Sequence, residues 1–72
     1  MTKREMIQTI QVAEAQAWKR FKEAQRRWGK EDELAGRLRG RWQVIYELRE
    51  ALGVEGLPVA ELIALDLVPT IG

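Results

Sequence analysis

Apolar side chains recur every three or four residues along the first 28 residues of the chain, and this spacing predicts a long amphipathic helix. At about 100° per residue they fall in one arc of roughly 140°. Thr2 and Glu5 match a capping box, which would start the helix at Lys3, and Gly29 would cap its end. We expect a helix over about residues 3–28, with the stripe Met6, Ile7, Ile10, Ala13, Ala17, Phe21, Ala24 and Trp28.

A second periodic segment predicts another helix, over about residues 31–52, that is more broadly apolar than the first. Its acidic start at Glu31, Asp32 and Glu33 suits the positive end of a helix dipole, and Gly53 follows its last residue. The apolar arc covers roughly 200°, so this helix needs cover on two sides. Its main stripe is Leu34, Leu38, Trp42, Ile45, Leu48 and Leu52, widened by Ala35, Val44 and Tyr46.

The C-terminal stretch LPVAELIALDLVPTIG holds only two charged residues and predicts a short helix that is apolar on all faces. Pro58 suits a first helical turn, and Pro69 disfavours helix in the residue before it, which places this helix at about residues 58–67. One face could cover the second helix, and the other would then need a second subunit. In a monomeric alternative, the tail simply completes a small core.

These segments predict an all-α fold in one small domain, residues 1–72: an antiparallel two-helix hairpin with a short third helix, completed as a helical bundle by dimerisation. A chain this short buries only about 60% of its unfolded surface. It has no cysteine, so disulfides cannot stabilise it. Self-association remains, and we expect a homodimer or a higher oligomer. The expected interface residues are Trp42, Tyr46, Leu57, Leu62, Ile63 and Leu65.

Three charged residues interrupt the apolar stripes: Glu14, Arg41 and Arg49. In a hairpin that turns at Gly29–Lys30, residue numbers at facing positions sum to about 62. Glu14 then faces the level of Arg49, which predicts an ion pair between the helices. Arg41 faces Phe21, so its guanidinium would run outward along an aromatic ring or reach an acid of a partner chain. Alternatively, all three charged residues lie in water at the edges of the stripes.

The composition argues against catalysis and against bound cofactors. The chain has no His, Cys, Ser or Asn, so it has no Ser–His or Cys–His pair and no usual transition-metal site. We expect no enzyme, no cofactor and no metal. No stretch reaches the roughly 18 apolar residues of a membrane span, and no secretory signal opens the chain. A cytoplasmic protein is therefore the default expectation.

The net charge of +1 is distributed unevenly along the chain. Residues 1–30 hold eight basic residues against three acidic ones, whereas residues 51–72 hold three acidic residues and no basic one. The turn gathers basic side chains at one end of the hairpin, where they could neutralise phosphates while nearby aromatic rings stack on bases. Those basic residues are Lys19, Lys22, Arg26, Arg27, Lys30, Arg37 and Arg39.

Two functional hypotheses follow. The first is a non-catalytic protein–protein interaction or structural protein that associates with itself, or with another protein, through the second helix and the tail. The second is a nucleic-acid-binding accessory protein that uses the basic end of the hairpin. Trp18 is expected at a helix–helix seam, and an exposed Trp18 would instead be a binding hot spot. No motif is specific enough to name a family.

Overall fold

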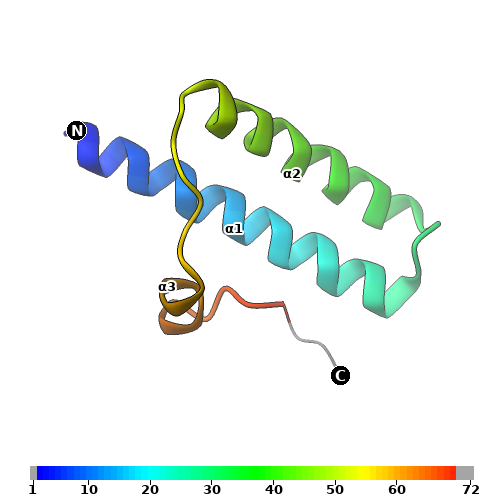
Figure 1. The fold of residues 1–72 in the computed structure, drawn as a ribbon. Coiled ribbons are helices and arrows are strands. Elements are labelled where there is room, and N and C mark those ends of the chain that lie inside the picture. Colours follow the sequence, from blue (N-terminus) through cyan, green and yellow to red (C-terminus); the bar gives the residue numbers. More distant parts are fainter. Residues whose placement is uncertain (1, 70–72) are drawn as a thin grey trace.

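The computed structural model describes residues 2–69, and that part of the chain is helical and free of strands (Figure 1). The helices are α1 (Lys3–Trp28), α2 (Glu33–Ala51) and α3 (Val59–Ala64). α1 and α2 lie side by side as an antiparallel hairpin, and the segment after α2 crosses α1, so that α3 lies on the side of α1 away from α2 (Figure 1). The all-α hairpin with a short third helix is therefore confirmed.

α1 begins and ends at the residues that the sequence indicates. The Thr2 hydroxyl accepts a hydrogen bond from the backbone N–H of Glu5 at 3.2 Å and donates one to the Glu5 carboxylate at 3.1 Å. These two bonds stabilise the first turn. At the other end, Gly29 has φ 95°, which side chains rarely allow, and its N–H donates to the carbonyl of Gln25 at 2.8 Å. Glycine therefore makes the turn possible.

α2 begins two residues later than expected. Asp32 precedes the helix, and its carboxylate accepts from the N–H groups of Leu34 and Ala35 at 3.0 and 3.3 Å. It caps the helix, because this bonding satisfies two N–H groups that have no partner within the helix. At the far end Gly53 has φ 68° and ends the helix with two backbone bonds, from Gly53 to Glu50 and from Val54 to Arg49.

α3 is shorter than expected, because it ends at Ala64, several residues before the position where Pro69 would stop a helix. Asp66 takes the left-handed conformation, with φ 55°, and its N–H donates to the carbonyl of Ile63 at 3.1 Å. The N–H of Leu67 donates back to Leu62 at 2.8 Å, which completes the same closing motif that ends α2. Leu67 is thereby turned back into the molecule and buried.

The inward face of α2 differs from the stripe that the sequence predicted. Ala35, Trp42 and Arg49 point inward at heptad spacing, and Ala35 is only 1% exposed. In contrast, Leu34 and Leu48 from the expected stripe are about half exposed. α2 is thus rotated about its axis relative to the expectation. Buried residues of α1 on the hairpin are Ala17, Phe21 and Ala24.

The third helix does not cover α2, which corrects a second expectation. The C-terminal segment, defined as residues 52–69, crosses α1 and buries Leu67 close to Ala15. It is fastened at two points of α1: the Gln11 side chain donates to the Glu55 carbonyl, and the Lys19 ammonium donates to the Asp66 carbonyl, both at 2.8 Å. The side of α2 that faces away from α1 is left without cover by either element (Figure 1).

Candidate functional site

The predicted ion pair between the long helices is present. Arg49 Nε lies 2.9 Å from Glu14 Oε1, and the two side chains are only 11% and 15% exposed. Arg49 also donates from Nη1 to the Val54 carbonyl at 2.7 Å, so one guanidinium joins α1, α2 and the C-terminal segment. Arg41 is exposed. The alternative that placed all three charges in water is thus wrong for Glu14 and Arg49.

Four aromatic rings line the seam beside this ion pair. Trp18 stacks edge-on against Phe21 at 5.6 Å and lies 4.7 Å from Trp42, whose ring is 5.2 Å from Tyr46. The Nε1 atom of Trp42 is buried, and no hydrogen-bond acceptor for it lies within the described residues. Trp42 and Tyr46, which the sequence placed at an interface with a partner, contribute their rings to the hairpin itself.

Tyr46 is half-buried at the edge of this aromatic cluster. A hydrogen bond to the Glu50 carboxylate and the negative charge of that group raise the pKa of Tyr46 above its usual value of 10.0, with smaller contributions from partial burial. The nearby Arg49 guanidinium acts in the opposite direction. The Tyr46 phenol therefore stays protonated at neutral pH.

One side of α2, next to its inward face, carries large apolar side chains in contact with water. We call this surface the outer face of α2. Val44 is 66% exposed, and the others are between 45% and 57% exposed. Burying such side chains against another apolar surface stabilises an assembly by about 1 kcal/mol or more for each of them. The outer face consists of Leu34, Val44, Leu48 and Leu52.

The remaining interface candidates lie in the C-terminal segment. Leu57 and Leu62 are half-buried and line a cleft where this segment crosses α1. Ile63 and Leu65 are exposed on α3. Because α2 and α3 lie on opposite sides of α1, these residues do not continue the outer face of α2 (Figure 1).

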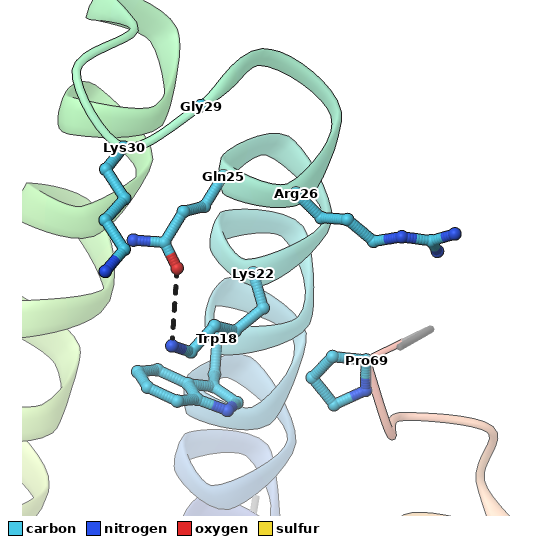
Figure 2. Close-up of a pocket in the computed structure, with 7 residues that line it drawn as sticks. All are labelled: Trp18, Lys22, Gln25, Arg26, Gly29, Lys30 and Pro69. Carbon is cyan, nitrogen blue, oxygen red and sulfur yellow. Dashed lines mark hydrogen bonds between the residues drawn. The ribbon is translucent and has the colours of Figure 1, made fainter. Parts of the chain in front are cut away.

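Three of the seven basic candidates surround one open pocket, which we call the Trp18 pocket (Figure 2). Its volume is about 560 Å³. The Lys22 ammonium lies 4.7 Å above the Trp18 ring and 3.4 Å from the side-chain oxygen of Gln25. The side chain of Lys30 extends from the turn toward the pocket, beside Gln25 (Figure 2). The lining residues used below are Trp18, Lys22, Gln25, Arg26, Lys30 and Pro69.

The other four basic candidates do not join this pocket. Lys19 is occupied by Asp66, and Arg37 pairs with Glu33 of its own helix at 2.9 Å. Arg27 lies over the ring of Trp28, and Arg39 is exposed on α2. The sequence pattern did not indicate that Pro69 would close one side of the pocket, because that contact depends on how the C-terminal segment docks.

No protein-family model, curated protein or solved structure matches this chain. Between residues 2 and 69, no helix is both long and apolar enough to cross a membrane. Function is therefore inferred from the outer face of α2 and from the Trp18 pocket.

Proposed function

We propose that the chain is a non-catalytic interaction or structural protein of the cytoplasm, which associates with itself through the outer face of α2. The observation that carries the proposal is the alignment of four large apolar side chains along one uncovered side of a 19-residue helix. Exposed apolar side chains grouped on one side of a helix mark interaction sites in soluble proteins, and here the stems of the exposed Arg37 and Arg41 lie in the same arc between Leu34 and Val44. A second copy offers the same face, so two copies bury both at once.

The charges of α2 favour an antiparallel arrangement of the two copies. Its amino-terminal half carries Glu33, Arg37, Arg39 and Arg41, a net charge of +2, whereas its carboxyl-terminal half carries Glu47, Arg49 and Glu50, a net charge of −1. Antiparallel docking sets the basic half of one helix at the level of the acidic half of the other, and it also opposes the two helix dipoles. Parallel docking would set like charges at the same level.

Substitution of the outer face tests the proposal by light scattering after size exclusion. The intact chain is expected to elute as a dimer. Leu48→Glu is expected to elute as a folded monomer, because a carboxylate at this exposed position is solvated in the monomer but would be buried in the dimer. Ile63→Glu on α3 is the matched control and should leave the dimer intact. A monomeric parent chain would contradict the proposal, and dissociation by Ile63→Glu alone would move the interface to the C-terminal segment.

A crosslink gives an independent readout, since the chain has no cysteine of its own. Val44 lies near the middle of α2, so in an antiparallel pair the two copies of this position approach each other. Val44→Cys is expected to form a disulfide-linked dimer under mild oxidation. Gln16→Cys, exposed on α1, should remain a free thiol. Equal crosslinking of both variants would indicate non-specific contact.

Nucleic-acid binding stays a second candidate, because Lys22, Arg26 and Lys30 surround a single pocket. Salt separates the two functions. Affinity for a nucleic acid falls by about one power of salt concentration for each phosphate neutralised, whereas apolar self-association persists under excluded salts. Titration of a single-stranded oligonucleotide at two salt concentrations measures the difference.

A further inference from the structure

The Trp18 pocket combines an apolar floor with a positively charged rim. Its walls come from parts of the chain that are far apart in sequence: α1 supplies Trp18 and Lys22, the turn supplies Lys30, and the C-terminal segment supplies Pro69 (Figure 2). The indole and proline rings, together with the methylene stems of the lysines, make most of the surface apolar. A ligand here would therefore bury hydrocarbon.

Two ammonium groups face this pocket. Lys22 is held over the Trp18 ring, and its nearest polar partner there is the neutral amide of Gln25, at the long distance of 3.4 Å. Lys30 extends down beside Gln25 toward the same space (Figure 2). Among the described residues that line the pocket, none is Asp or Glu. Lys22 is thus paired with an aromatic ring and an amide, which neutralise no charge, and an anion would bind it more strongly.

The size and chemistry together define a ligand class. We infer that the Trp18 pocket binds a small organic anion: a planar apolar ring system that carries one acidic group. The ring lies against the apolar wall formed by Trp18 and Pro69, and the acidic group accepts hydrogen bonds from Lys22 and Lys30. This site is separate from the outer face of α2, so it adds a ligand to the proposed self-association and does not depend on it.

The experiment compares two probes that share one ring system. The first is 8-anilinonaphthalene-1-sulfonate, and the second is N-phenyl-1-naphthylamine, which lacks the sulfonate. Each is titrated into the full-length ¹⁵N-labelled chain while the indole N–H resonance of Trp18 is followed. The sulfonate is expected to shift this resonance in a saturable way, with an affinity at least about tenfold above that of the neutral probe.

Charge-neutralising variants identify the cations. Lys22→Gln combined with Lys30→Gln is expected to weaken sulfonate binding about tenfold. The matched control, Lys3→Gln with Arg4→Gln, removes the same two charges from the far end of α1 and should leave the affinity unchanged. Both variants alter exposed or half-exposed side chains, so the folded hairpin is retained, and the dispersion of the spectrum verifies this.

Three results with the two probes would overturn the inference, and a fourth comes from an oligonucleotide. The first is equal affinity for the charged and neutral probes. The second is a set of shifts confined to the outer face of α2, with Trp18 unmoved. The third is equal weakening by the pocket variant and its control. If only a single-stranded oligonucleotide moves the Trp18 resonance, in a strongly salt-dependent manner, the pocket belongs to the nucleic-acid function and not to a small ligand.

Discussion

The two faces of α2 both carry large apolar side chains, yet only one of them is buried. On the inner face, Ala35 allows the helices to approach closely, and Trp42 and Arg49 meet specific partners on α1. On the outer face, Val44 and Leu48 remain more than half exposed. Apolar content therefore does not by itself choose the buried face of α2. The buried face is the one that carries the ion pair and the aromatic cluster.

Removing the ion pair of the inner face is expected to have the largest effect on stability. Arg49→Met leaves the Glu14 carboxylate buried without its partner, which costs about 3–5 kcal/mol of unfolding free energy and brings a domain of this size near its unfolding midpoint. Urea denaturation followed by circular dichroism measures the loss. Arg41→Met, at an exposed position of the same helix, is the control and should stay within about 0.5 kcal/mol.

Adding Glu14→Leu to the Arg49→Met variant sharpens this test. Replacing both members of a buried pair by apolar groups removes the unpaired charge, so the double variant is expected to regain most of the lost stability. Equal stability of Arg49→Met and Arg41→Met would show that the ion pair does not determine how α2 faces α1.

Substitutions at two neighbouring residues of α2, Ala35 and Leu34, compare the stability that the inner and outer faces contribute at one level of the helix. Ala35→Leu forces a large side chain into a position that is 1% exposed and is expected to cost about 1–3 kcal/mol. Leu34→Ala, on the outer face, is expected to cost less than about 1 kcal/mol, because that side chain is already about half in water. Thermal unfolding of the monomer, at dilution, measures both. A larger cost for Leu34→Ala would reverse the assignment of inner and outer faces.

The smallest expected effect lies at the edge of the inner face, at Tyr46. Since the folded state raises the pKa of this group above 10.0, the hydrogen bond to Glu50 stabilises the fold below pH 10 and loses its effect as the pH rises through the folded pKa. Glu50→Gln should move the pKa back toward 10.0, and Glu47→Gln should not. Tyr46 is the only tyrosine, so its absorbance titration near 295 nm is unambiguous. An identical titration in all three proteins would remove Glu50 as the cause.

The sequence was most informative where a structural cause is local. Thr2 and Gly29 predicted the limits of α1, and a hairpin register counted from the turn brought Glu14 opposite Arg49. The sequence was less informative about α2. A helix that is apolar over half its circumference can pack in several orientations that bury a similar apolar area. The rotation chosen depends on contacts across the seam, such as that between Trp18 and Trp42, which periodicity within one helix does not encode.

The site was predicted only in part, for a related reason. The position of Lys22 and Lys30 near the hairpin turn follows from their sequence numbers, but the arrival of Pro69 depends on the path of the C-terminal segment. That path turns at Asp66, a non-glycine residue in the left-handed conformation, which no Gly or Pro signal marks in the sequence. The apolar character of the tail suggested that it would cover α2, whereas its polar anchors at Glu55 and Asp66 hold it on α1.

Those two anchors also have a consequence for the order of folding. They join residues 44 and 47 positions apart, whereas the hairpin around Gly29 closes through a short turn. Closing a longer loop costs more chain entropy, so the hairpin is expected to form first and the C-terminal segment to dock last and to detach first. Because Pro69 is one wall of the Trp18 pocket, each detachment also dismantles the pocket. A molecule bound in the Trp18 pocket would therefore make detachment of the C-terminal segment less frequent. Slower amide hydrogen exchange at Leu67, which does not line the pocket, would then indicate that the pocket is occupied.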